Sequence, residues 1–365
     1  MCRAHFILKG TSPMAFTAHM RLAFVLALAV ALPCSMALAQ SQVVDVTVHS
    51  AGLEHNLLGD PADQPVSIYL PDAYAHDTER RFPVLYFLHG YGGDPATHQN
   101  AEHFRAAMDK DIAAGTVKPM IVVLPNGSNK YHGAFYANSS TLGNWDDYIV
   151  KDVVGYVDSH YRTLASAEHR GLAGHSMGGF GTLTLGFRHP DVFGSIYAMS
   201  PCCTDLAGDQ GPSQREWVEA GRLHSPDDVP AALKTGRFFV AADAAMTAAL
   251  APDPNSKTLG DMPFVMADGS LKTDPVAYAR IAGNMPSNMV VPLLPKIAQL
   301  KGIFIEYGAQ ENFSHIVIGA QETAERLSQA GISNTLEVFQ GDHGSRLLQR
   351  ITDRMLPWMS AQIAQ

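Results

Sequence analysis

The most informative motif of this chain is Gly174-His175-Ser176-Met177-Gly178-Gly179. It follows residues 170–173, a short and largely apolar run typical of a buried strand, and it precedes residues 180–185, which favour a helix. The glycines on either side of the serine have the G-x-S-x-G spacing of a sharp strand-to-helix turn, where β-carbons would find no room. The sequence therefore predicts that Ser176 presents its hydroxyl at the end of a strand as a nucleophile.

A nucleophilic serine needs a base, and His343 is the candidate. It lies in Gln340-Gly341-Asp342-His343-Gly344-Ser345, directly after the strand-like run 336–339. A histidine on a glycine-flanked loop at the carboxyl end of a strand lies at the edge where doubly wound sheets hold their sites. The chain has 16 histidines, so this location is what separates His343 from the others.

Glu311 is the candidate for the acid that orients the imidazole. It falls in the loop after residues 302–307, an apolar run of strand type, and the segment between Glu311 and His343 has room for one helix and one strand. Asp342 and Asp243 are rivals for this role. Asp342 is adjacent to His343 in sequence, which disfavours a productive geometry, and Asp243 follows another apolar run.

Two backbone N–H groups are expected to stabilise the oxyanion that forms when the serine attacks a carbonyl group. One belongs to Met177, directly after the nucleophile, and the other to a glycine-rich loop after an early strand. That loop is Leu88-His89-Gly90-Tyr91-Gly92-Gly93, which follows the apolar run 82–87. The second N–H is expected from Tyr91, because the glycines around it let the backbone approach a substrate closely.

Together these motifs resemble the esterase D-like (putative esterase) branch of the α/β-hydrolases, which includes feruloyl esterases, S-formylglutathione hydrolases, siderophore esterases and mycolyltransferases. The resemblance runs from about residue 66 to residue 350 and rests on the segments 66–71, 88–93, 135–139 with Trp145, 161–163, 174–179, 308–311 and 342–344. It implies an α/β-hydrolase fold, with the nucleophile at Ser176, the acid at Glu311, the base at His343 and the oxyanion amides at Tyr91 and Met177. Many members carry aspartate where this chain has Glu311.

The resemblance also implies substrate contacts for Trp145 and Tyr136, and His175 beside the nucleophile is a candidate to line the pocket. Core packing is the alternative for these side chains. His315 has no partner that the sequence identifies. No metal or organic cofactor is implied by any of these motifs.

Alternating strand and helix patterns predict a mostly parallel central sheet with helices on both faces. The expected strands are 43–49, 66–71, 83–88, 120–124, 170–175, 194–199, 302–307 and 334–339, and the expected helices are 99–114, 145–160, 178–188, 318–330 and 346–363. Residues 204–296 separate two core strands by far more than an ordinary connection, so they are predicted to form an inserted cap. Within this cap, residues 238–250 have helical potential, and the cap would wall an acyl or aromatic pocket.

Residues 1–39 are typical of a signal peptide. Their only Lys and Arg residues are Arg3, Lys9 and Arg21, residues 22–32 are apolar, and Ala37-Leu38-Ala39 fits the small-x-small cleavage pattern. An uncleaved anchor is the alternative. Residues 40–365 would then form one catalytic domain in the periplasm or outside the cell, which disfavours a glutathione-dependent reaction.

Composition limits the possible domain organisation and binding partners of the protein. The chain has 365 residues, 46% of them hydrophobic and 17% charged, which suits one large α/β domain. Its formal charge of −9, without basic runs, makes nucleic acid and anionic membrane surfaces poor partners. Beyond the leader, the only cysteines are Cys202 and Cys203, whose position after an expected strand could bring them to the pocket. Their redox state stays open between two buried thiols, an exposed thiol and a vicinal disulfide.

These observations favour an exported serine esterase that acts through a Ser-His-Glu triad on feruloyl-type or short acyl esters, either small or linked to a polysaccharide. An acyltransferase of the mycolyltransferase type and a siderophore esterase are the enzymatic alternatives. A binding protein on an inactive hydrolase scaffold is the alternative outside catalysis.

Overall fold

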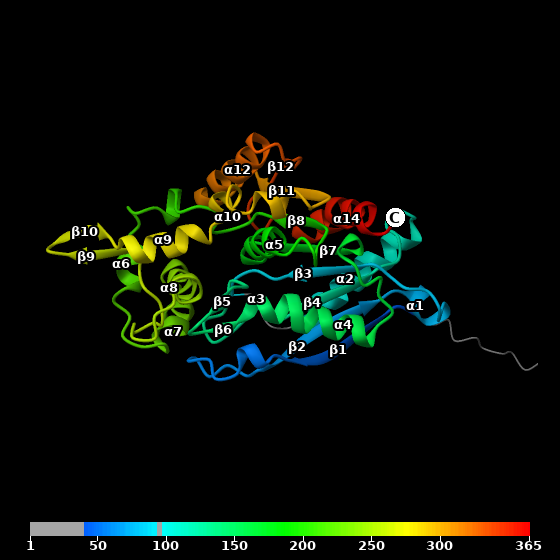
Figure 1. Cartoon of the computed structure of the whole chain (residues 1–365), viewed down its shortest axis with the longest axis horizontal. Helices are drawn as coiled ribbons and strands as arrows, with labels where there is room; N and C mark the ends of the chain where they lie inside the picture. Colours follow the sequence, from blue (N-terminus) through cyan, green and yellow to red (C-terminus); the bar gives the residue numbers. More distant parts are fainter. Residues whose placement is uncertain (1–39, 93–96) are drawn as a thin grey trace, which may run out of the picture. The chain divides into compact units, whose positions relative to one another are not determined.

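The computed structural model describes residues 40–92 and 97–365, and Figure 1 shows them as a coloured ribbon. The predicted signal peptide, with Cys2 and Cys34, lies outside the described residues, as does Gly93 of the glycine-rich loop. No helix within the described ranges is long and apolar enough to cross a membrane.

The central sheet has eight strands in the order β1-β2-β4-β3-β7-β8-β11-β12. β1 and β4 each run antiparallel to β2, and all other neighbours are parallel. The strands are β1 (Gln42–His49), β2 (Asp63–Leu70), β3 (Val84–Leu88), β4 (Ile121–Pro125), β7 (Arg170–His175), β8 (Ser195–Met199), β11 (Gly302–Gly308) and β12 (Thr335–Phe339). Each of the predicted strands overlaps one of these, so the prediction of a mostly parallel sheet is confirmed.

Side chains that alternate along the strands build a core on each face of the sheet. In β3, Tyr86 and Leu88 belong to one buried cluster, whereas Leu85 and Phe87 belong to the other. This division follows from the two-residue period of a strand, and all five residues of β3 are buried because both faces are covered.

Helices on both faces complete the domain. They are α1 (Asp72–His76), α2 (Thr97–Ala113), α3 (Trp145–Asp147), α4 (Val154–His160), α5 (Met177–Arg188), α6 (Arg215–Ala220), α7 (Asp228–Lys234), α8 (Phe238–Leu250), α9 (Pro275–Gly283), α10 (Pro286–Met289), α11 (Leu294–Ile297), α12 (Ser314–Gln329), α13 (Leu347–Arg350) and α14 (Leu356–Ile363). α5 packs on β7 and β8 from one face, and α14 packs on the same two strands from the other. Two predicted helices contain π-helical turns, η2 (Tyr148–Val153) and η5 (Ile351–Met355).

The segment predicted as a cap holds several small elements between β8 and β11. It contains α6 to α10 and a hairpin of β9 (Phe264–Ala267) and β10 (Ser270–Thr273). In Figure 1 the hairpin lies at one end of the ribbon with α6 to α9, whereas α10 lies nearer to α12. α8 is the longest of them and packs against α6 and α7. Shorter turns and strands elsewhere are η1 (Ala51–Leu53), η3 (Ala167–His169), η4 (Gly208–Gln210), β5 (Asn138–Ser139) and β6 (Gly143–Asn144).

Parallel pairing brings distant loops to one edge of the sheet. The loops after β3, β7, β8, β11 and β12 all leave from the carboxyl ends of mutually parallel strands. In open α/β sheets this edge is where ligands bind. The candidate nucleophile, base, acid and oxyanion loop all lie on these connections.

Candidate active site

Ser176 lies at the junction of β7 and α5 in a conformation that few residues adopt. Its backbone has φ 58° and ψ −117°, a strained combination that costs roughly 1–3 kcal/mol and persists only where the surroundings impose it. The motif glycines impose it by their lack of a side chain. A β-carbon on Gly174 would lie 2.4 Å from the Gly178 oxygen, and one on Gly178 would lie 2.0 Å from the Leu88 oxygen.

The Ser176 turn is fixed to the neighbouring strand β8. The Ser176 N–H donates to the Met199 oxygen at 3.0 Å, and the Cys202 N–H donates to the Ser176 oxygen at 3.1 Å. The hydroxyl itself lines a pocket and makes no hydrogen bond within residues 40–92 and 97–365. The backbone is therefore held rigidly while the side-chain oxygen stays available.

The glycine-rich loop after β3 lies directly against the nucleophile. A β-carbon on Gly90 would come within 3.2 Å of the Ser176 β-carbon, so only glycine allows this approach. The backbone N–H groups of Tyr91 and Met177 donate to no acceptor in the part of the chain that the structure describes. Both amides are thus free to donate to a ligand, and their role as oxyanion donors stays a prediction.

His89 and Tyr136 hold this loop in place by hydrogen bonds. The Gly127 N–H donates to His89 Nε2 at 2.8 Å, so the other ring nitrogen, Nδ1, carries the hydrogen and donates to the Gly90 oxygen at 2.9 Å. Burial lowers the pKa of His89, which keeps this ring neutral. The Tyr136 hydroxyl donates to the His89 oxygen at 2.9 Å. Neither side chain faces the pocket that Ser176 lines.

His343 and Glu311 form a hydrogen-bonded pair on the loops after β12 and β11. His343 Nδ1 lies 3.1 Å from Glu311 Oε1 and 3.2 Å from Oε2. The Glu311 side chain is fully buried, and its Oε1 also accepts from the Asn312 N–H at 3.0 Å. A carboxylate fixed in this way orients the imidazole and leaves Nε2 as the nitrogen that can accept a proton.

The two rival acids do not contact the His343 side chain. Asp342 instead accepts hydrogen bonds from the Ser345 N–H at 2.8 Å and hydroxyl at 2.5 Å, which closes the turn of the loop. The apolar run before Asp243 begins α8, in agreement with the helical potential predicted for residues 238–250, and Asp243 is buried inside that helix.

His175 connects the base loop to the nucleophile turn. Its Nε2 donates to the His343 backbone oxygen at 2.9 Å, and the two imidazole centroids lie 4.6 Å apart. Burial, and after it the neighbouring His343, lowers the pKa of His175 to about 4. A neutral His175 thus holds the base loop next to Ser176.

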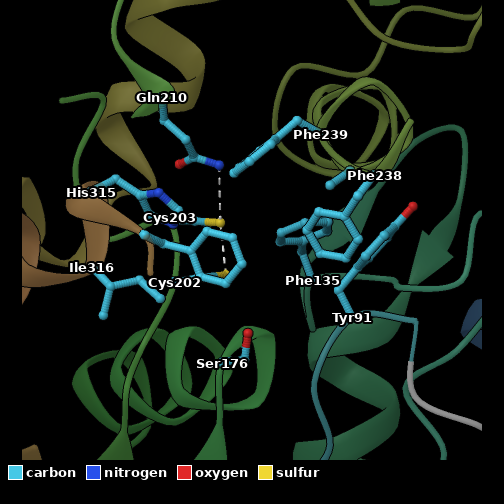
Figure 2. A pocket seen from close by; sticks show the side chains of 12 residues that line it. Tyr91, Phe135, Ser176, Cys202, Cys203, Gln210, Phe238, Phe239, His315 and Ile316 are labelled. Carbon is cyan, nitrogen blue, oxygen red and sulfur yellow. Dashed lines mark hydrogen bonds between the residues drawn. The ribbon is translucent and has the colours of Figure 1, made fainter. Parts of the chain in front are cut away.

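Aromatic rings make up much of the pocket that Ser176 lines (Figure 2). Phe238 and Phe239 come from the start of α8, whereas Tyr91, Phe135 and Phe313 come from three other segments. The Phe238 ring lies 5.6 Å from Tyr91 and 6.2 Å from Phe313, centroid to centroid. The predicted cap segment thus supplies part of the wall, and the sequence signal for it is the pair Phe238-Phe239 at the start of a helical run.

Two polar side chains and two thiols also line the pocket. The polar side chains are Gln210 and His315, and the thiols are Cys202 and Cys203. Both cysteines are free and buried, with their sulfur atoms 2.7 Å apart, so the expectation that the pair could line the pocket is confirmed. His315 pairs with Asp209, at 2.7 Å from Nδ1 to Oδ1, a partner that the sequence does not reveal.

Trp145 and Tyr136 do not reach the pocket. Both are fully buried, and Trp145 Nε1 donates to the Leu142 oxygen at 2.9 Å within the core. A β-carbon on Gly127 would lie 2.3 Å from the Tyr136 ring. Their place in the structure is therefore the packing alternative, and Tyr136 acts on the site only through His89. Among the described residues no group of three or more His, Cys, Asp or Glu side chains is arranged to hold a metal ion.

Comparison with known families identifies the chain. The family model described as putative esterase matches residues 61–247, just over half of the sequence. The chain belongs to the putative esterase family. The matched region includes Tyr91 and Ser176 and ends before Glu311 and His343.

Curated relatives of the chain are longer proteins. An esterase of Mycobacterium tuberculosis is 36% identical over 139 residues, which are 37% of this chain and 28% of the relative. An endo-1,4-beta-xylanase/feruloyl esterase of Xylanibacter ruminicola is 30% identical over 134 residues, 36% of this chain and 18% of the relative. The chain thus matches less than a third of the length of these relatives.

Solved structures of other hydrolases share the fold. A ferulic acid esterase superposes with a TM-score of 0.62 at 22% identity, covering 88% of this chain and 98% of the other. An S-formylglutathione hydrolase from Agrobacterium tumefaciens gives 0.56 at 17% identity, covering 89% and 96%. These similarities show that the domain has the α/β-hydrolase fold.

Proposed function

We propose that the protein is an exported serine esterase that hydrolyses feruloyl-type or short acyl esters, small or linked to a polysaccharide, through an acyl-enzyme on Ser176. One observation carries the proposal. Ser176 has a strained backbone and a free hydroxyl that lies on a pocket wall. The His343 ring is bound by the Glu311 carboxylate, and the His343 backbone oxygen accepts a hydrogen bond from His175, the residue before Ser176. Family membership and the names of the relatives support an ester as the substrate.

The first half of the reaction acylates the serine. His343 Nε2 takes the hydroxyl proton as Ser176 Oγ attacks the ester carbonyl carbon, and Glu311 stabilises the imidazolium that results. The carbonyl oxygen becomes negative and accepts hydrogen bonds from the free amides of Tyr91 and Met177. The carbon–oxygen bond to the alcohol then breaks, and His343 returns its proton to the leaving alcohol.

The second half releases the acid by the same groups. His343 takes a proton from a water molecule that attacks the acyl carbon, and the tetrahedral intermediate again forms against the two amides. Its collapse frees the carboxylic acid, and the proton on His343 returns to Ser176 Oγ. No metal or organic cofactor enters either half of this proposal.

The lining of the pocket supports flat aromatic or short acyl groups. Five aromatic side chains border the pocket. A planar ring between such side chains gains stacking and edge contacts, each worth about 0.5–1.5 kcal/mol.

Substitution of the nucleophile or the base tests the proposal. Ser176→Ala and His343→Ala are each expected to lower kcat for p-nitrophenyl acetate by about 10⁴-fold or more, because these two residues act as one unit. Unchanged circular dichroism would show that the variants are folded. Hydrolysis by the folded Ser176→Ala variant at the parental rate would exclude the serine-esterase mechanism.

A conservative change tests the acid separately. Glu311→Gln keeps the size of the side chain but removes the charge that stabilises the imidazolium, so kcat should fall by about 10³- to 10⁴-fold. Asp342→Asn is the matched control, because Asp342 binds Ser345 rather than the imidazole. A larger loss of kcat in Asp342→Asn than in Glu311→Gln would show that Asp342, and not Glu311, is the acid that orients His343.

A further inference from the structure

Two adjacent thiols, those of Cys202 and Cys203, lie in the wall of the pocket that Ser176 lines. Both are free, with exposed fractions of 8% and 3%. Their sulfur atoms lie 2.7 Å apart, so they are already in contact and need only a small approach to form a bond. The proposed esterase reaction uses neither thiol, and the pair is therefore a nucleophilic group without an assigned role.

The two sulfur atoms have different surroundings. The side-chain amide of Gln210 donates to Cys203 Sγ at 3.6 Å, and Figure 2 draws this contact together with the one between the two sulfurs. An N–H beside a sulfur stabilises the negative charge that develops on it during an attack. Burial, and after it the contact with Cys203, raises the pKa of the Cys202 thiol. Cys203 is therefore the sulfur that attacks an oxidant first, and Cys202 is the one that attacks second.

The backbone around the pair is strained and is tied to the nucleophile turn. Ser200 and Cys203 have φ angles of 39° and 56°, in the left-handed region that side chains rarely adopt. The Ser200 N–H donates to the Glu306 oxygen at 2.7 Å, and the Cys202 N–H donates to the Ser176 oxygen at 3.1 Å. Backbone strain of this kind gathers at active sites and switch regions. A new bond between the two sulfurs would therefore act on the turn that holds Ser176.

A bridge between neighbouring residues would be reversible. Consecutive α-carbons lie about 3.8 Å apart, which is less than the about 4.4–6.8 Å that most disulfides span. A bridge between adjacent cysteines is strained for this reason, and strained disulfides are the ones that are readily reduced. Such a bridge would serve as a switch and not as a permanent support of the fold.

We propose that Cys202 and Cys203 are a redox modification site, which hydrogen peroxide converts into a reversible disulfide that slows the enzyme. Cys203 Sγ attacks one peroxide oxygen, the O–O bond breaks, and a sulfenic acid and one water form. Cys202 Sγ then attacks the Cys203 sulfur, the S–O bond breaks, and the disulfide forms as the second water leaves. Two thiols are thereby oxidised and one peroxide is reduced. The oxidant has to be small, because both sulfurs are almost fully buried.

The bridge should lower the rate of hydrolysis. Closing the ring displaces the Cys202 backbone, whose N–H binds the Ser176 oxygen. Because a displacement of about 1 Å can cost 10²-fold in rate, kcat/KM for p-nitrophenyl acetate should fall by about threefold to a hundredfold on oxidation. Dithiothreitol should restore it. This effect rests on the proposed esterase function, whereas formation of the bridge does not.

The mass of one peptide tests the bridge on the parental protein without reference to its activity. Trypsin cleavage after Arg188 and Arg215 releases residues 189–215, which contain Cys202 and Cys203 and no other cysteine. After treatment with hydrogen peroxide and alkylation of free thiols, this peptide should be two hydrogen atoms lighter and carry no alkyl group. Dithiothreitol before alkylation should restore two alkylated thiols. A peptide that stays fully alkylated after peroxide, or that carries sulfinic or sulfonic acids in place of the bridge, overturns the proposal.

A double variant assigns the change in activity to the bridge. In the protein with both Cys202→Ser and Cys203→Ser, the rate of hydrolysis, whatever its level, should be the same with and without hydrogen peroxide. Parental sensitivity to peroxide in this variant, or a bridge in the parent that leaves its rate unchanged, would contradict the switch. If no Ser176-dependent hydrolysis is found in either redox state, the proposed function fails, while the peptide mass still decides whether the bridge forms.

Discussion

At the scale of single residues, the chemistry depends on side chains whose protonation state is set by their surroundings. His175 is the clearest case, since it carries no obvious catalytic role and yet contacts the base loop. Its proximity to Ser176 is visible in the sequence, which predicts it as a pocket residue, but it is not among the side chains that line the pocket with Ser176. Its hydrogen bond to the His343 backbone, 168 positions away, is not predictable, because no motif marks a backbone oxygen as the partner of a side chain.

The low pKa of His175 predicts how stability depends on pH. The ring titrates near 6.5 in the unfolded chain and near 4 in the folded protein. The unfolded state therefore binds more protons between these values, and the stability contributed above pH 6.5 is lost as the pH falls through 4. This loss amounts to at most about 3 kcal/mol.

Denaturant unfolding at pH 7 and at pH 4.5 measures the effect. His175→Gln, whose amide can still donate to the His343 oxygen, should lose less free energy of unfolding between the two pH values than the parent does. Equal losses in the parent and the variant would show that His175 is not held neutral by the fold.

At the scale of elements, the sequence predicts what local pattern controls. The eight core strands and the helix after Ser176 are predicted from apolar runs that are bounded by glycines. α8 is predicted from its run of small apolar residues. The π-helical turns η2 and η5 are not predictable, because they continue an ordinary helical pattern. The small elements of the cap are also missed, since short helices such as α6 and α7 form only by packing on α8.

The sharp turn between β7 and α5 yields a stability prediction. Gly178→Ala would place a β-carbon 2.0 Å from the Leu88 backbone oxygen, and the free energy of unfolding should fall by about 3 kcal/mol. Gly155→Ala in α4 is the control, because its β-carbon would meet no atom within 4 Å; there the helix should gain up to about 1 kcal/mol. Urea unfolding compares the two. Similar free energies of unfolding for the two variants would mean that the turn after β7 can accommodate a β-carbon at residue 178.

At the scale of the whole molecule, the sheet gathers residues that are far apart in the chain. Tyr91, Ser176, Glu311 and His343 lie on loops that leave the same edge, because the strands before them are parallel. Motifs and strand order predict this arrangement. The Asp209–His315 pair is not predictable in the same way, since one partner lies in an irregular stretch without a strand or helix pattern.

The most direct test of the account is the site and rate of labelling by a fluorophosphonate probe, followed by mass spectrometry of the intact and digested protein. A single covalent adduct on Ser176 is expected, with a labelling rate that falls by about 10³-fold or more in His343→Ala, because an unactivated serine hydroxyl is a weak nucleophile. An adduct on another residue, or parental labelling of Ser176 in His343→Ala together with its loss in His315→Asn, would contradict it.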